Sequence, residues 1–209
     1  MDKLIQRIQI GLGVTIILLG LIGCDVLRQA ASHLRFFGIS GDLVERVSDG
    51  DTLVVKDSQG NKFTVRFACM DAPEIAHSQK EKATKRASDR NQFTWGTKAQ
   101  ARVQQLVQQG GDRVILNITD SDRYGRKIAE IRLKNGTFVQ QVLLREGLAK
   151  VYRPYLNKCP SKDLVQQAET EAKQRRLGIW SDAKFVNPWE YRSLNKVSGA
   201  KVLNQIKNN

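Results

Sequence analysis

Apolar and polar residues begin to alternate regularly at Leu43, and this alternation predicts short strands in the first part of the chain. Turn-forming residues at positions 48–50 and 57–60 separate the apolar runs. The predicted strands are Leu43–Val47, Thr52–Lys56 and Lys62–Met70.

The third predicted strand divides its side chains between two faces. Phe63, Val65, Phe67 and Cys69 share one face, because successive side chains of a strand point to opposite sides. Arg66 therefore lies on the other face, away from the apolar residues.

Helical spacing of apolar residues begins after Gly96 and stops at Gly110-Gly111, which predicts a helix between them. Further elements follow in the order strand, strand, helix, helix. They are Val114–Thr119, Lys127–Leu133, Thr137–Glu146 and Ser161–Leu177. In the last helix Ser161 is a favoured N-cap, and Leu164, Ala168 and Ala172 repeat at four-residue steps.

The segment from Ile75 to Trp95 is polar and has no apolar period, so we expect a long mobile loop. It carries five basic residues against two acidic ones, and a loop of net charge +3 could embrace a polyanion. A solvent-exposed loop that has no function fits the same pattern.

Five short strands with one helix after the third and two near the end predict an α+β, mainly β fold. The specific expectation is a five-stranded OB-type barrel capped by three helices, over residues 41–182. Residues 25–40 are interpreted as a spacer, and residues 183–209 as a C-terminal tail whose last stretch is loosely held.

The first 24 residues have the character of an export or anchoring segment. Lys3 and Arg7 precede an apolar run from Ile8 to Ile22, and the about fifteen apolar residues are fewer than the ~20 that a membrane span needs. The run ends in Leu21-Ile22-Gly23-Cys24, which resembles the lipobox of bacterial lipoproteins, so we expect lipidation of Cys24. An uncleaved single span is the alternative. Either anchor predicts an exported domain on the periplasmic or extracellular side of the membrane.

The chain has 34 lysines and arginines against 21 acidic residues, a net charge of +13. A field of this sign favours nucleic acid, acidic lipid headgroups or acidic proteins as partners, and charge does not choose among them.

Cys69 and Cys159 could form a disulfide in an oxidising compartment or remain two separate buried thiols. With only two histidines and no Cys-x-x-Cys, the sequence argues against a zinc site.

Two carboxylates on separate predicted strands, Asp51 and Asp71, are candidate ligands for one hard divalent cation. Asp49 lies on the same side of the chain as Asp51, but a role in the turn explains it better. Glu74 follows Pro73 and could act on an attacking water, which is worth roughly 10²–10⁴ in rate.

Two arginines complete this candidate site. Arg66 has the forked geometry that clamps a phosphate with two parallel hydrogen bonds. Arg126 begins a strand directly after Gly125, where a sharp turn can present it to developing negative charge.

Six segments, in this order, resemble the staphylococcal nuclease family over roughly residues 41–182. They are Asp49-Gly50-Asp51-Thr52, Val65-Arg66, Asp71-Ala72-Pro73-Glu74, Asp122-Arg123-Tyr124-Gly125-Arg126, Gly147-Leu148-Ala149-Lys150-Val151 and Leu177-Gly178-Ile179-Trp180. The resemblance implies an OB-type barrel with three helices. It also implies Ca²⁺-dependent hydrolysis of DNA and RNA at the 5′ P–O bond, which leaves 3′-phosphate ends.

The resemblance also implies a role for each matching residue. The implied calcium ligands are Asp51, Asp71 and the main-chain carbonyl of Ala72, the implied phosphate contacts are Arg66 and Arg126, and the implied general base is Glu74. Alanine replaces the family's threonine at Ala72, but the implied contact is through the backbone.

Aromatic positions of the family are only partly kept. Tyr155 occupies one of two tyrosine positions that frame the nucleotide pocket, whereas Arg153 occupies the other and Tyr152 is nearby. Arg123 and Tyr124 match basic and aromatic neighbours of that pocket, so base stacking on Tyr155 is a hypothesis.

The sequence therefore predicts a membrane-tethered calcium-dependent nuclease of low sequence specificity, with DNA and RNA as partners and no obligate protein partner evident. The alternative is a catalytically silent OB-type module that binds single-stranded nucleic acid. A weaker alternative makes the basic segment a docking site for acidic lipid.

Overall fold

The structure is a computed structural model that describes residues 41–196 of the 209. The predicted anchor with Cys24, the spacer and the last thirteen residues of the tail lie outside the described residues. Within residues 41–196 no helix combines the length and apolar character needed to cross a bilayer.

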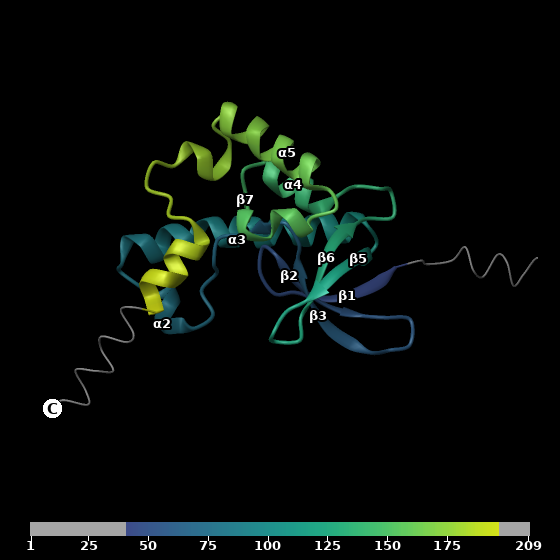
Figure 1. Ribbon diagram of the computed structural model, residues 1–209. Helices are drawn as coiled ribbons and strands as arrows, with labels where there is room; N and C mark the ends of the chain where they lie inside the picture. The colour runs from purple at the N-terminus through teal and green to yellow at the C-terminus, as the bar shows by residue number, and fades with distance from the viewer. Residues whose placement is uncertain (1–40, 197–209) are drawn as a thin grey trace, which may run out of the picture. The chain divides into compact units, whose positions relative to one another are not determined.

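Five strands close into a barrel in the order β1-β2-β3-β6-β5 (Figure 1). Their bounds are β1 Asp42–Val47, β2 Thr52–Lys56, β3 Lys62–Phe67, β5 Arg113–Ser121 and β6 Lys127–Arg132. All neighbouring pairs are antiparallel except β3 and β6, which are parallel. The barrel encloses fully buried residues from every strand except β1, among them Leu53, Val65, Val114 and Ile131.

The three predicted helices are present in the predicted order: α3 Ala87–Gln109, α4 Val139–Arg145 and α5 Lys162–Gln174. The shorter elements are α2 Gln79–Lys82, β4 Met70–Asp71, β7 Lys150–Val151, η1 Arg153–Lys158 and η2 Gly178–Ser181. α3 contacts β1, β5 and α4, and α4 packs on both β6 and α5. The predicted mainly β barrel with capping helices is confirmed.

The predicted strand Lys62–Met70 is wrong in its last third. β3 ends at Phe67, and Cys69 adopts a positive φ of 73°, which breaks the extended run. Met70 and Asp71 then form β4 and pair with β7 outside the barrel. The kink is held because the N–H of Ala68 donates to Ala129 O at 2.8 Å and Cys69 O accepts from the N–H of Tyr152 at 2.9 Å. Asp71 therefore leaves the barrel wall and lines a cavity that Arg66 also lines.

The predicted mobile loop over residues 75–95 is also wrong. It contains α2 and the first nine residues of α3, which begins at Ala87 and not after Gly96. These turns are held mainly by polar contacts: Asn91 and Trp95 both donate to Asp182 Oδ2, at 2.7 and 2.8 Å. A helix anchored in this way carries little apolar periodicity, which is why the sequence pattern did not reveal it.

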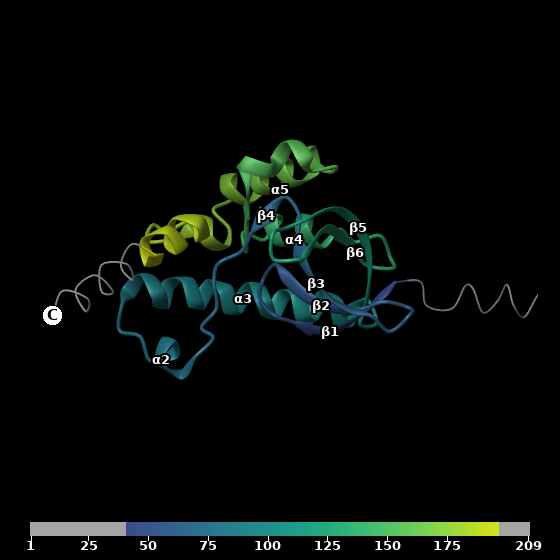
Figure 2. The same cartoon turned by 60° about the horizontal axis from the view of Figure 1, so that its bottom comes forward.

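The tail packs on the domain as far as the structure describes it, to residue 196, and the expectation of a loosely held last stretch falls outside the described residues. Residues 188–196 are helical, and Tyr191 is only 5% exposed. Its hydroxyl lies 2.9 Å from Asp89 Oδ1, and its ring meets Phe93 edge-on with centroids 6.4 Å apart. Figure 2 shows α3 reaching past the barrel, with this C-terminal helix alongside its first turns.

The start of α5 differs in detail from the prediction. Ser161 is the N-cap residue, but its hydroxyl donates to Glu130 Oε2 at 3.0 Å and makes no capping hydrogen bond. Leu164 is exposed, and Val165 takes the buried position beside Ala168. Ala168 and Ala172 are buried as predicted, so the predicted stripe is wrong only at its first position.

Gly96 sits where α3 crosses the backbone that follows Asp71. A Cβ at Gly96 would lie 2.1 Å from Glu74 O and 2.7 Å from Pro73 O. The absence of a side chain therefore lets α3 lie directly against the segment that carries Glu74.

We expect Gly96→Ala to lower the free energy of unfolding by about 1–3 kcal/mol, because steric overlap with the Pro73–Glu74 backbone outweighs the ~1 kcal/mol gain in helix propensity. Urea unfolding followed by circular dichroism measures this. Thr97→Ala is the matched control at the next, exposed position of α3. A Gly96→Ala protein as stable as the wild type would contradict the close approach.

Candidate active site

Two buried carboxylates lie at the centre of the site. Asp51 precedes β2 and is 2% exposed, and Asp71 ends β4 and is 1% exposed. Arg66 of β3 donates from Nη1 to Asp51 Oδ1 and from Nη2 to Asp71 Oδ1. One guanidinium thus joins the two acids that the sequence placed on separate strands.

The backbone fixes the direction of Asp51. Its Oδ2 accepts from the N–H of Ala72 at 2.8 Å, and its Oδ1 accepts from the hydroxyl of Thr52 at 3.1 Å. Asp49 Oδ1 accepts from the N–H of Asp51 at 2.9 Å, which is the turn-stabilising contact expected for Asp49. The Asp51 carboxylate is therefore held in place before any substrate arrives.

The electrostatics of this cluster favour an added cation. Burial raises the pKa of Asp51 well above its ordinary range, and the charges of Asp49 and Asp71 raise it further, against the opposing effect of Arg66. Burial disfavours the charged Arg66 guanidinium, yet attraction to Asp51 and Asp71 outweighs this and raises the pKa of Arg66. The acids are crowded and incompletely neutralised.

A hard divalent cation fits this donor set. The two carboxylates converge on one guanidinium fork, so a cation could share both, and the carbonyl of Ala72 and water could supply further oxygen ligands. In residues 41–196 the only triad of His, Cys, Asp or Glu with closely clustered ligand atoms is Cys69, Glu130 and Cys159. A cation between Asp51 and Asp71 would thus need main-chain and water ligands.

Glu74 lines the same cavity as Arg66 and Asp71. Its Oε1 accepts from Nη1 of Arg192 at 2.6 Å, and Arg192 also donates to both oxygens of Asp71. Burial disfavours the charge of Arg192, but hydrogen bonds to Asp71 and Glu74 outweigh this and raise the pKa of Arg192. The site therefore holds a second arginine that the sequence interpretation did not include.

Arg126 lies in the same cavity but does not touch the carboxylates of Asp51 and Asp71. Its Nε donates to Asp122 Oδ2 at 2.7 Å, and Asp122 Oδ1 accepts from its backbone N–H at 3.0 Å. Gly125 has a φ of 81°, which produces the expected sharp turn before β6. Arg126 and Arg66 line one cavity of about 860 Å³.

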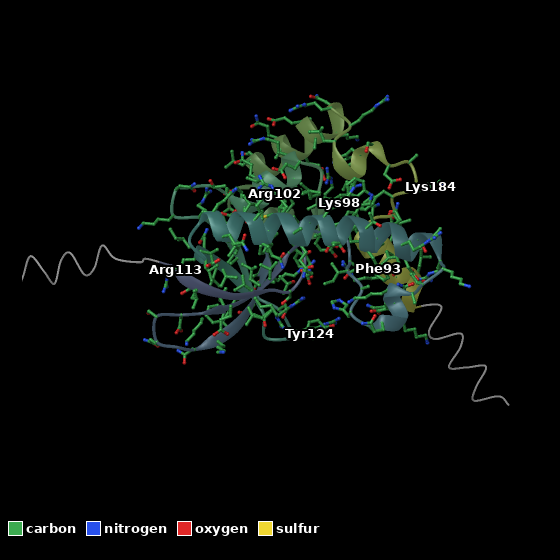
Figure 3. The ribbon with its side chains drawn as sticks, turned by 180° about the vertical axis from the view of Figure 1, so that it is seen from behind. Phe93, Lys98, Arg102, Arg113, Tyr124 and Lys184 are labelled. Atoms are coloured by element: carbon green, nitrogen blue, oxygen red, sulfur yellow. A yellow bond between two sulfur atoms is a disulfide. The ribbon has the colours of Figure 1, made fainter. Side chains whose placement is uncertain are left out.

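Exposed aromatic rings border this cavity. Tyr124 is 70% exposed on the loop between β5 and β6, where Figure 3 labels it, and Arg123 stacks over its ring at 4.9 Å. Tyr155 is 58% exposed and lies 5.7 Å from the ring of Tyr152, which in turn contacts Trp189. These rings offer flat surfaces on which bases could stack.

Arg153, which the resemblance predicts at a second tyrosine position, does not line this cavity. Its Nη2 donates to Glu169 Oε2 at 2.7 Å on α5. The side chains of Tyr152 and Tyr155 line the cavity instead.

Cys69 and Cys159 form a disulfide, which settles the choice that the sequence left open. The bond joins the kink before Asp71 to a residue three positions before α5, across 90 positions of sequence. Beside it Glu130 is buried, and its Oε1 accepts from the N–H of Ser161 at 2.7 Å. The disulfide thus tethers the segment that carries Asp71.

Sequence reasoning missed Arg192 because its segment has few apolar residues. One signal was available: Asn187-Pro188 is a favourable helix start, since proline suits the first turn. Trp189 and Tyr191 directly after it could have served as anchors.

Comparison with known proteins shows the family of the chain. Residues 64–182 match the family described as "Staphylococcal nuclease homologue". The chain is similar to an uncharacterized endonuclease of Escherichia coli, with 34% identity over 71% of this chain and 82% of that protein. It is similar to the micrococcal nuclease of Shigella flexneri, with 30% identity over 73% and 80%. It is also similar to endonuclease YncB of Bacillus subtilis, with 35% identity over 68% and 63%.

Proposed function

The chain belongs to the family of staphylococcal nuclease homologues, and on this premise we propose that it is a calcium-dependent phosphodiesterase. Its proposed substrates are DNA and RNA, cut with low sequence specificity to leave 3′-phosphate ends. The observation that carries this proposal is the sharing of one guanidinium, Arg66, by the buried carboxylates of Asp51 and Asp71.

Asp51, Asp71 and the carbonyl of Ala72 are the proposed calcium ligands. Bound there, Ca²⁺ would neutralise phosphate charge and polarise the phosphoryl oxygens. Oxygen donors are the ligands that this ion prefers, and a site built from only two carboxylates fits the weak binding found in extracellular modules.

The chain's own side chains would position the phosphodiester. Arg66 and Arg126 line the same cavity and could hold non-bridging oxygens from two directions. Glu74 would accept a proton from the attacking water, while the bond between phosphorus and the 5′-oxygen breaks. The water oxygen would form a new bond to phosphorus as its proton moves to the Glu74 carboxylate, and the bonding pair would leave with the 5′-oxygen, which takes a proton from solvent water.

Low specificity follows from the kinds of group around the cavity. Arginines contact phosphates, which are the same in every nucleotide. Tyr124 and Tyr155 offer ring faces that accept any base.

The alternative function is a module that binds single strands without cutting them. A domain that had lost catalysis would be expected to lose its carboxylates or phosphate arginines first. All five candidate residues are present, and the two buried acids retain Arg66 between them. We therefore propose hydrolysis as the function in preference to binding without cleavage.

We further propose that residues 1–24 export and tether the domain at the outer side of a bacterial membrane, through a lipid on Cys24. The apolar run and its terminal cysteine support this proposal. An oxidising location also suits the disulfide between Cys69 and Cys159.

The metal requirement is tested with the full-length protein purified in mild detergent. Digestion of plasmid DNA and of RNA should proceed with millimolar Ca²⁺ and stop with excess chelator, because the crowded carboxylates need a dication. Release of acid-soluble nucleotides measures both reactions, and restored calcium should restore them. Cutting that continues in chelator would remove the metal assignment, and absence of cutting under all conditions would favour the binding module.

The phosphate-clamp assignment is tested by Arg66→Lys and Arg126→Lys. Each should lower kcat by about 10²–10³-fold, because lysine keeps the charge but cannot make the paired hydrogen bonds. Arg145→Lys is the matched control, since Arg145 pairs with Glu171 on the α4–α5 side and does not line the cavity. Circular dichroism should show an intact fold, and near-normal rates in both variants would refute the clamp.

The anchor is tested by labelling cells with palmitate. The wild-type protein should take up label and sediment with membranes, and Cys24→Ala should lose the label. If the wild type sediments without label, an uncleaved apolar span is the better account of the tether.

A further inference from the structure

The helix at residues 188–196 carries a cation into the centre of the candidate site. Arg192 donates from Nη1 to Asp71 Oδ1 at 3.2 Å and to Glu74 Oε1 at 2.6 Å, and from Nη2 to Asp71 Oδ2. This residue lies ten positions beyond the segment that matches the family. Its contacts engage one proposed calcium ligand and the proposed base together.

These hydrogen bonds occupy the oxygens that a dication would need. Asp71 Oδ1 accepts from both Arg66 and Arg192, and Asp71 Oδ2 accepts from Arg192. A dication that binds Asp71 repels the guanidinium and competes for the same lone pairs. Arg192 must then give up at least its contact with Asp71.

The backbone that carries Arg192 is firmly held. Tyr191 is buried and bonded to Asp89, and Lys150 Nζ donates to Asn187 Oδ1 at 2.7 Å just before the helix begins. Gln92, itself fully buried, donates to Val186 O. The side chain of Arg192 can therefore turn while its helix stays in place, so its charge remains at the cavity wall.

The neighbouring cavity wall is suited to a phosphate. Lys196 follows Arg192 by four residues, so the two side chains share one face of the helix, and both line the cavity that contains Arg66 and Arg126. Trp189, three residues before Arg192, contacts Tyr152 on the side where bases would stack. A released guanidinium would lie beside a second cation, in a place where a polyanion can neutralise both.

We propose that Arg192 is a substrate-contacting residue that exchanges partners: it pairs with Asp71 and Glu74 when no dication is bound, and with a substrate phosphate next to the scissile one when calcium occupies Asp71. The identity of the substrate rests on the proposed function. In the exchanged state Arg192 would also no longer donate to Glu74 Oε1, so this oxygen of the proposed base is left open to water.

The competition is measured by calorimetric titration of the full-length protein with CaCl₂ alone. Arg192→Ala should bind calcium about 5- to 10-fold more tightly than the wild type, because its competitor at Asp71 is absent. Lys196→Ala is the matched control and should keep the wild-type calcium affinity, since it removes a cation from the same helix face without removing a contact to Asp71. Unchanged or weaker calcium binding by Arg192→Ala overturns the proposal.

The second half of the exchange is measured by steady-state cleavage of single-stranded DNA at saturating calcium. Arg192→Ala should raise KM about 5- to 10-fold, and the dependence of log(kcat/KM) on log[salt] should become shallower by about one phosphate contact. Lys196→Ala should shift both in the same direction, and Arg145→Ala should shift neither. Tighter calcium binding with an unchanged KM overturns the proposal, because Arg192 would then compete with calcium for Asp71 without contacting the substrate.

Arg192→Gln retains a side chain of similar reach without the charge. It should reproduce the changes in calcium affinity and KM if Arg192→Ala folds poorly, which circular dichroism would reveal. Failure of the proposed function appears as a wild-type protein that does not cut nucleic acid. Failure of the exchange appears as an unchanged calcium affinity in an active wild-type background.

Discussion

The site depends on one interaction, the guanidinium of Arg66 between the buried carboxylates of Asp51 and Asp71. Each carboxylate alone would be costly to bury, and burial does raise the pKa of Asp51. The shared arginine offsets that cost and aims both acids at one point. The barrel supplies the frame: Asp51 comes from the turn before β2, Arg66 from β3, and Asp71 from the short strand beyond the kink at Cys69.

Much of this frame could be predicted from the sequence because local patterns determine it. Strands β1, β2 and β6 alternate and are bounded by turn residues, so their limits follow within a residue or two. The first turns of α3 could not be predicted in this way. They are anchored by Asn91 and Trp95 on Asp182, contacts between positions about 90 residues apart that leave no local period. The kink at Cys69 likewise depends on a partner in another part of the chain, Cys159.

The residues of the candidate site also divide into those that the local sequence predicts and those that only distant contacts bring to the site. Asp51, Arg66 and Asp71 lie on neighbouring stretches of a recognisable motif, and the structure brings them together. Arg126 lines the same cavity as Arg66 and Asp71, but its guanidinium donates to Asp122. Arg192 comes from a segment outside the motif, and tertiary contacts such as that of Tyr191 with α3 bring it to Asp71. Its placement is a property of tertiary structure, which neither spacing nor resemblance to the family encodes.

The C-terminal helix changes where the domain ends. The family match stops at residue 182, and a gene trimmed there would encode a protein without Tyr191. The truncated product would leave Asp89 and Phe93 facing water and would strip Asp71 and Glu74 of a counter-ion. A boundary drawn from homology alone would therefore yield a more acidic cleft with an unsupported first turn of α3, and its behaviour would not represent the intact enzyme.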